Sequence, residues 1–167
     1  MFKNNVRTIS SLSVYWGMIS LVRTTSEHPD FIKLVKLLDT YLAITDGDEH
    51  SFYAQFNKIN LLKNVVIAYQ DELAVGCGAF KSFEQNKIEM KRMFVREEFR
   101  GKKIASQVLN ELELWGKELG YLHYVLETGI RQLEAISLYH KTGYKIIPRY
   151  GQYINVANSV CFEKKIA

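Results

Sequence analysis

Cysteine is scarce in this chain of 167 residues, which contains only Cys77 and Cys161. Each lies within an apolar run, and their spacing matches neither a metal-binding motif nor the framework of a disulfide-rich domain. We therefore expect both to be small core residues of a protein in a reducing cytoplasm. The two cysteines give no reason to expect a metal centre.

Long hydrophobic runs are also missing. The apolar stretch at 11–22 follows Lys3 and Arg7, but it is too short and too rich in serine to span a bilayer, and no clear cleavage site follows it. A natural strand start at Met18 predicts that residues 1–17 are an N-terminal extension or a misassigned leader. Residues 18–167 have the length of one domain with its own core.

Acidic residues are outnumbered, with 18 Asp and Glu against 22 Lys and Arg, a formal charge of +4 and a pI near 9.0. A basic surface attracts anions such as nucleotides, nucleic acid or acidic lipid. The basic residues form no extended stripe with interleaved aromatic residues, which makes nucleic-acid binding the less favoured hypothesis.

Apolar periodicity predicts a mixed α/β domain. Helices are expected from Pro29 to near Gly47, after Asp48, from Ile104 to Gly120 and over 133–141. The third of these should turn one face inward, with Ile104, Val108, Leu112, Trp115 and Leu119 on it. Strands are expected at 19–23, 65–69, 73–80, 88–95, 121–127, 144–147 and 159–164. The three strands in the middle of the chain should pair antiparallel in sequence order.

A basic turn over 96–105 joins a strand to the clearest helix of the chain. Arg96, Arg100, Lys102 and Lys103 lie in it together with one glycine, Gly101. The start of a helix presents unpaired backbone N–H groups, and these favour an anion such as a phosphate. A basic turn alone is as well explained as a solvated surface, so its neighbours in the sequence decide the interpretation.

The segment 100–105, Arg-Gly-Lys-Lys-Ile-Ala, resembles the Arg/Gln-x-x-Gly-x-Gly/Ala loop of the GNAT superfamily of N-acetyltransferases. The resemblance extends in the right order to 88–95, 126–129, 135–144 and 159–163. It implies a small, bacterial-type, single-domain GNAT protein. The implied fold is a mostly antiparallel sheet with a splayed parallel strand pair, flanked by helices.

The resemblance also implies a binding site for acetyl-CoA. The loop residues Arg100, Gly101, Lys102, Lys103, Ile104 and Ala105 would hold the pyrophosphate. The backbone N–H of Met93 would point at the thioester oxygen, and Phe94 and Val95 would pair with the pantetheine arm.

Two positions depart from the family pattern. Lys103 replaces a glycine, which we expect to be harmless because the residue should lie in the first helical turn with negative φ. Gln132 replaces an asparagine that contacts the cofactor.

Two residues are candidates for proton transfer. Glu89 lies where the resemblance implies a general base, although it could equally form ion pairs with Lys91 and Arg92. Tyr139 matches the family tyrosine, whose phenol is protonated at neutral pH and can donate to the departing thiolate. The alternative for Tyr139 is a purely structural role in the core. The acceptor pocket is predicted from five aromatic residues, which are Tyr41, Phe52, Tyr53, Phe56 and Tyr150.

The leading hypothesis is an acetyl-CoA-dependent N-acetyltransferase that acts in a ternary complex on a small-molecule or amino-acid-like amine, without a metal. The alternative is a catalytically idle domain that binds or senses acyl-CoA. No nucleic-acid or membrane partner is expected, a homodimer is left open, and the expected location is the cytoplasm.

Overall fold

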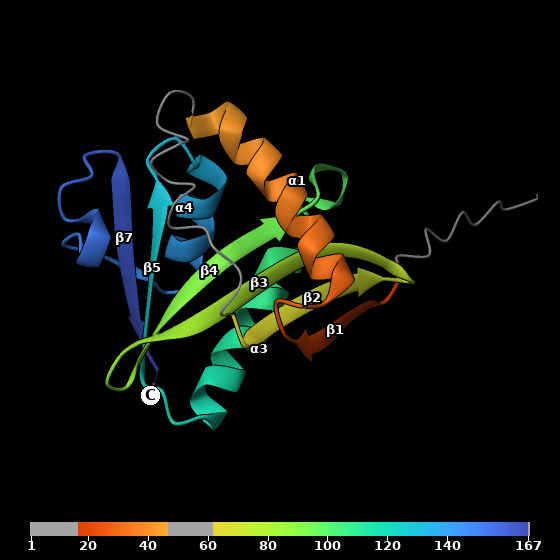
Figure 1. The fold of residues 1–167 in the computed structure, drawn as a ribbon, viewed down its shortest axis with the longest axis horizontal. Helices are drawn as coiled ribbons and strands as arrows, with labels where there is room; N and C mark the ends of the chain where they lie inside the picture. Colours follow the sequence, from red (N-terminus) through yellow and green to blue (C-terminus); the bar gives the residue numbers. More distant parts are fainter. Residues whose placement is uncertain (1–16, 47–61, 167) are drawn as a thin grey trace, which may run out of the picture.

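The computed structural model describes residues 17–46 and 62–166. Within these ranges one sheet of seven strands runs through the molecule in the order β1-β2-β3-β4-β5-β7-β6 (Figure 1). The strands are β1 (Ile19–Thr24), β2 (Asn64–Gln70), β3 (Leu73–Glu84), β4 (Lys87–Val95), β5 (His123–Gly129), β6 (Lys145–Ile147) and β7 (Ser159–Lys165). The helices are α1 (Pro29–Asp46), α3 (Ile104–Glu118) and α4 (Leu133–Lys141), with short 3-10 turns η2 (Glu97–Phe99) and η3 (Gly151–Tyr153). The predicted α/β class is confirmed.

The parallel pair β4–β5 interrupts an otherwise antiparallel sheet. Only three residues of each strand are in register, from Lys87 opposite His123 to Glu89 opposite Val125. Beyond this point the two strands diverge, as Figure 1 shows. The predicted splay is therefore confirmed. From Met90 onward, the edge of β4 that faces β5 does not pair with it.

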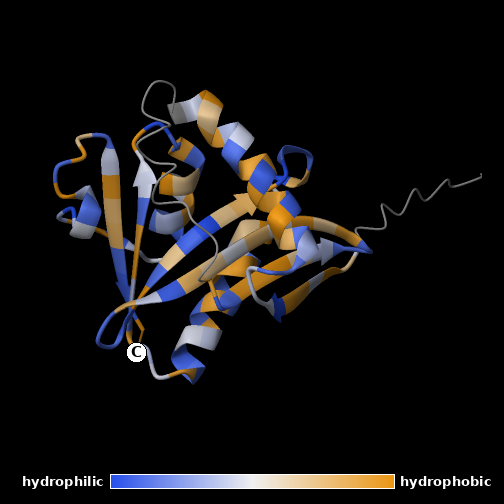
Figure 2. Cartoon of the chain, in the orientation of Figure 1, coloured by the Kyte–Doolittle hydropathy of each residue, from blue (hydrophilic) through white to orange (hydrophobic). Residues whose placement is uncertain are grey.

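Two apolar cores lie on opposite faces of the sheet. Helix α1 buries Phe31, Leu34, Val35 and Leu38 against β2, β3 and the end of β4. On the other face α3 buries Ile104, Val108, Leu109 and Leu112, with Tyr139 of α4 in the same core. Each such side chain stabilises the fold by about 1.5–3 kcal/mol. Figure 2 shows that β4, between these cores, has hydrophilic residues in its middle and hydrophobic residues at its end.

A β-bulge lies in the middle of β4. Cys77 pairs with Phe94 and Ala79 with Lys91, so Gly78 alone faces two residues, Arg92 and Met93. Arg92 has a positive φ of 59°. A Cβ on Gly78 would collide with the Met93 sulfur and come within 2.9 Å of Leu112 Cδ1, so a glycine is needed opposite the bulge.

Several element boundaries differ from those predicted. Helix α3 ends at Glu118 and Leu119 is 54% exposed, because the chain already turns there into Gly120, whose φ is 87°. The turn continues to Leu122, so β5 begins at His123 and not at Tyr121. The helix predicted after Asp48 and most of the predicted N-terminal extension lie outside the described residues.

None of the helices in 17–46 and 62–166 has the length and apolar character needed to cross a lipid bilayer.

Candidate active site

The basic turn leads from the end of β4 into the start of α3. Gly101 has a φ of 76° and Lys103, the residue before the first turn of α3, has a φ of 61° and ψ of 18°. The first backbone N–H groups of α3 have no partner within the helix and carry its positive dipole end. The turn therefore leads into a helix start of the kind that favours an anion, and the binding of a phosphate there stays a prediction.

The expectation for Lys103 was wrong. The residue is not inside the first helical turn but precedes it in the left-handed conformation, and its carbonyl accepts the helical hydrogen bond from Gln107 N at 3.1 Å. Left-handed geometry costs a residue with a Cβ roughly 1–2 kcal/mol relative to glycine. The chain keeps the backbone shape for which the family uses glycine, at the cost of strain.

Arg100 connects the turn to two other elements. Its Nε donates to Val95 O at 3.2 Å, its Nη1 donates to Glu134 Oε2 at 3.2 Å, and its guanidinium lies 4.7 Å from the ring centre of Tyr41. Lys102 instead places its ammonium 4.8 Å from the ring centre of Phe99.

A large cleft of about 750 Å³ opens where β4 and β5 diverge, between the basic turn, α1 and α4. We call it the large cleft. Residues proposed from sequence for the cofactor gather in it, namely Met93, Phe94, Val95, Arg100, Gly101, Lys103, Ile104, Ala105 and Gln132. Tyr41 lines this cleft as well, although the sequence assigned it to an acceptor pocket. Lys102 does not line it.

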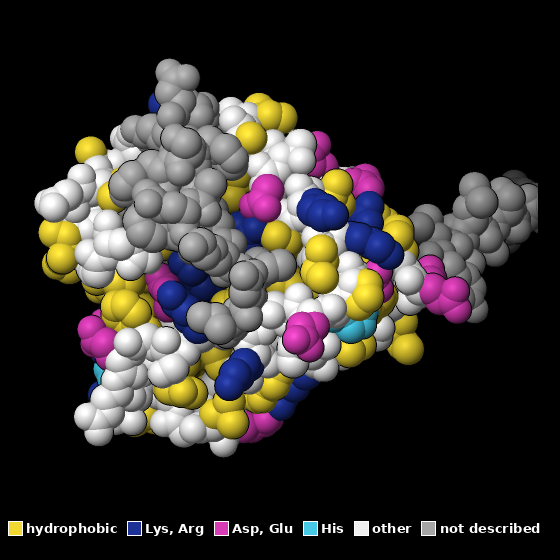
Figure 3. All heavy atoms as spheres, in the orientation of Figure 1, with side chains coloured by type: hydrophobic (Ala, Val, Ile, Leu, Met, Phe, Trp, Pro, Cys, Tyr) yellow, Lys and Arg dark blue, Asp and Glu magenta, His cyan; other side chains and the backbone are white. Residues whose placement is uncertain are grey.

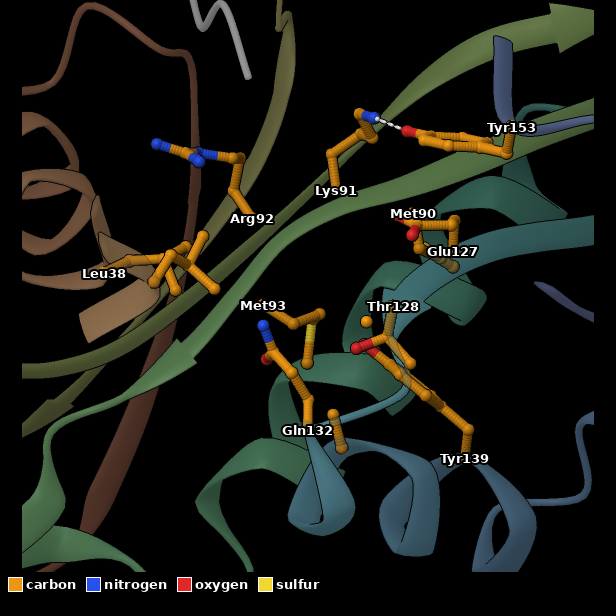
Figure 4. Close-up of a pocket in the computed structure, with 13 residues that line it drawn as sticks. Leu38, Met90, Lys91, Arg92, Met93, Glu127, Thr128, Gln132, Tyr139 and Tyr153 are labelled. Carbon is orange, nitrogen blue, oxygen red and sulfur yellow. Dashed lines mark hydrogen bonds between the residues drawn. The ribbon is translucent and has the colours of Figure 1, made fainter. Parts of the chain in front are cut away.

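A smaller cavity of about 110 Å³, which we call the polar cavity, adjoins the large cleft. Its charged and hydroxyl-bearing lining consists of Lys91, Arg92, Glu127, Thr128, Tyr139 and Tyr153. The two spaces share Leu38, Met93, Gln132, Ala135 and Tyr139 in their walls. Figure 3 shows Lys and Arg side chains in the middle of this face of the molecule, and Figure 4 shows the residues of the polar cavity.

Tyr139 lies where the two spaces meet. It projects from α4 toward the end of β5 that carries Thr128 (Figure 4). Only 5% of the residue is exposed, and its ring has edge contacts with Tyr144 and a tilted contact with Phe162. Burial, and then the negative charge of Glu127, raise the pKa of the phenol above its ordinary value, so it stays protonated at neutral pH.

Glu89 is almost completely buried and lines neither space. Its Oε1 accepts a hydrogen bond from Tyr150 at 3.1 Å, and the ammonium groups of Lys91 and Lys81 lie 3.6 Å and 3.4 Å from its two oxygens. Burial, followed by the charge of Glu89, raises the pKa of Tyr150 far above its ordinary value. Of the two ion pairs considered from sequence, Lys91 forms one. Arg92 does not, because the bulge directs it to Asp39 instead.

Lys91 links Glu89 to the polar cavity. Its Nζ donates to the Tyr153 hydroxyl at 3.0 Å, and its side chain is 11% exposed (Figure 4). Burial lowers the pKa of this ammonium, partly offset by the nearby Glu89 carboxylate.

The predicted acceptor pocket was only partly testable. Tyr150 contacts Glu89 but does not line the polar cavity, and Phe52, Tyr53 and Phe56 lie outside the described residues.

Sequence reasoning missed Glu127, although it lies two residues after Val125, the β5 partner of Glu89. Alternation along β5 puts Glu127 on the same face as Glu89, but only the register of the two strands, which the sequence does not contain, reveals this. Among the described residues, no group of three His, Cys, Asp or Glu side chains could hold a metal ion.

Comparisons with known proteins agree on one family. The model of the family described as "Acetyltransferase (GNAT) family" matches residues 31–144. An "IAA acetyltransferase" of Azospirillum brasilense is 29% identical over 156 residues, which cover 89% of this chain and 98% of that protein. A Klebsiella pneumoniae structure described as an acyl-CoA N-acyltransferase has a TM-score of 0.75 at 26% identity, covering 89% of this chain and 97% of its own. The PaiA N-acetyltransferase of Thermoplasma acidophilum, solved in complex with coenzyme A, has a TM-score of 0.67 at 23% identity and covers 89% and 99%.

Proposed function

Because this chain belongs to the GNAT acetyltransferase family, we propose that it transfers the acetyl group of acetyl-CoA to the amine of a small-molecule or amino-acid-like acceptor. The acceptor attacks the thioester directly while both substrates are bound. The two free, buried cysteines fit a reducing compartment, and we propose the cytoplasm as its location.

The splay of β4 from β5 is the observation that carries this proposal. From Met90 onward β4 has no β5 partner, and the large cleft runs along that open side to the basic turn. A pantetheine arm can pair there with the backbone of Phe94 and Val95 as an added strand does. Its pyrophosphate then reaches the start of α3, where backbone N–H groups and Arg100 favour an anion.

The thioester would lie where the large cleft meets the polar cavity. The bulge leaves Met93 without a registered partner on β3. We propose that the Met93 N–H stabilises the oxygen of the thioester carbonyl as it becomes negative. The nitrogen of the acceptor forms a bond to the carbonyl carbon, the carbon–sulfur bond breaks, and Tyr139 gives its proton to the thiolate.

The amine must lose a proton before or during attack. Glu89 is the proposed base and acts through water, because its carboxylate lies behind Lys91 and not in the cavity wall. Glu127 is the carboxylate that lines the cavity, and we propose that it attracts the acceptor as an ammonium ion. The idle acyl-CoA-binding alternative is not favoured, because a phenol and two carboxylates lie at or beside the junction.

Isothermal calorimetry with acetyl-CoA and a screen of amines for coenzyme A release test this function. We expect saturable binding that weakens as salt rises, since charge screening reduces the attraction of the basic turn. Release of coenzyme A should depend on the amine. Absence of saturable binding at millimolar acetyl-CoA would refute the proposal, and binding without turnover of any amine would favour the idle domain.

A further inference from the structure

The bulge in β4 brings two consecutive cations into one cavity. Successive residues of a regular strand point to opposite faces, so Lys91 and Arg92 would normally be separated by the sheet. Here both line the polar cavity, because Arg92 is one of two residues opposite Gly78 and has a φ of 59°. In Figure 4 both side chains extend to the same side of β4. A strained backbone conformation at this position is of the kind that is retained at functional sites.

Arg92 has donors that no other described residue accepts. Its side chain is 3% exposed, and its Nη2 donates to Asp39 Oδ1 at 2.6 Å. Its Nε and Nη1 are buried and find no hydrogen-bond partner within residues 17–46 and 62–166. Leaving buried charged donors unpaired is costly, and a guanidinium forms its strongest hydrogen bonds with carboxylate or phosphate oxygens.

Lys91 supplies the second cation of the cavity. Its ammonium donates to Tyr153 and lies 3.6 Å from Glu89, so it is held in place. Among the described residues of the same lining, Glu127 provides the one negative charge. The cavity wall therefore carries two positive groups on β4 and one negative group on β5.

We propose that the acceptor is an aminocarboxylate, such as an amino acid, whose carboxylate binds Arg92 and Lys91 while its ammonium group faces Glu127. This rests on the proposed acetyl transfer. A cavity of about 110 Å³ can hold these two groups and little else, so the rest of the acceptor extends outside it. A phosphate in place of the carboxylate would bring a second negative charge toward Glu127.

The test compares acceptors that differ only in the anionic group. A panel of amino acids is assayed with acetyl-CoA beside the matching carboxamides, the decarboxylated amines and phosphoethanolamine. Loss of an ionic hydrogen-bonded pair at a buried site should lower kcat/KM by about 10–100-fold for the carboxamide. In Arg92→Gln the ratio of kcat/KM between an amino acid and its carboxamide should fall toward one. Lys36→Gln, which removes an exposed cation of α1, should keep the wild-type ratio.

Acetyl-CoA affinity of each variant is measured on the same samples, so that a folding defect is recognised. If Arg92→Gln folds poorly, the variant Arg92→Lys is used in its place. The ratio of kcat/KM between an amino acid and its carboxamide should fall in that variant too. If amines are acetylated but carboxamides or decarboxylated amines match the amino acids, the aminocarboxylate proposal is wrong and acetyl transfer stands. A preference for phosphoethanolamine also overturns it. If no acceptor on the panel or in the broader amine screen is acetylated, the proposed function itself fails.

Discussion

The large cleft and the polar cavity differ in what their walls offer to a ligand. The large cleft relies on backbone, namely the open side of β4, the left-handed residues Gly101 and Lys103, and the start of α3. The polar cavity offers charged and hydroxyl side chains that come from β4, β5, α4 and η3. A site made of backbone can keep a constant cofactor while its side chains change, whereas a site made of buried charges is specific to one arrangement of groups.

Tyr139 lines both the large cleft and the polar cavity, so its replacement should have the largest effect on turnover. Tyr139→Phe keeps the ring and its contacts with Tyr144 and Phe162 but removes the proton donor. We expect kcat to fall by about 10²–10⁴, the usual contribution of a positioned acid, while acetyl-CoA affinity is kept. Steady-state kinetics and calorimetry on the same sample measure both. An unchanged kcat would assign the proton to solvent or to another group.

Replacing Glu89 and Glu127 in turn tests which of the two carboxylates takes the proton and which attracts the acceptor. Glu89→Gln should lower kcat by about 10², with a loss that shrinks at high pH because more of the amine is then already neutral. Glu127→Gln should mainly raise KM for the acceptor, since it removes the charge that pairs with the ammonium. The measurement is the pH profile of kcat and KM for both variants. The opposite pattern, with the pH-dependent loss of kcat in Glu127→Gln, would make Glu127 the base.

Thermal stability is measured for both carboxylate variants, because Glu89→Gln also leaves Lys81 and Lys91 without their buried partner. A loss of kcat with an unchanged melting temperature would separate the chemical role from the structural one.

The smallest effect is expected in the large cleft, where backbone conformation and not side-chain identity is used. Lys103→Gly should remove about 1 kcal/mol of left-handed strain and raise the melting temperature by about 2–4 °C. The matched change Gly101→Ala puts a Cβ at a φ of 76° and should lower the melting temperature by a similar amount, although no atom stands within 4 Å of that Cβ. Differential scanning calorimetry compares the two. A lower melting temperature for Lys103→Gly would show that the lysine side chain, and not the backbone strain, dominates there.

Much of the fold was predictable because it depends on local patterns. The helical spacing of Phe31, Leu34 and Leu38 predicted the buried face of α1. The splayed strands were implied by the resemblance of the ordered motifs to the GNAT superfamily. The φ of Lys103 was not predictable from its residue type, since it depends on how the loop must close between β4 and α3. Arg92 gave no sign of a bulge, because the glycine that accommodates it, Gly78, is on the neighbouring strand.

The same limit applies to the polar cavity. Glu127 and Tyr153 are far from Lys91 in sequence, and the register of β5 against β4 and the path of the chain before β7 bring them together. Backbone motifs can be found in a single sequence, whereas a charge constellation assembled over long range cannot.

At the bulge, β4 has one residue more than the facing part of β3. Before it, Met90 packs into the core under α3, and after it Val95 packs into that same core, although their odd spacing would put them on opposite faces of a regular strand. Deleting Arg92 would therefore restore simple alternation and leave both side chains correctly placed. A shortened chain of this kind should keep its core and lose the meeting of Lys91 and Arg92 in the polar cavity, so the two cations share a wall because of one extra residue between Lys91 and Phe94.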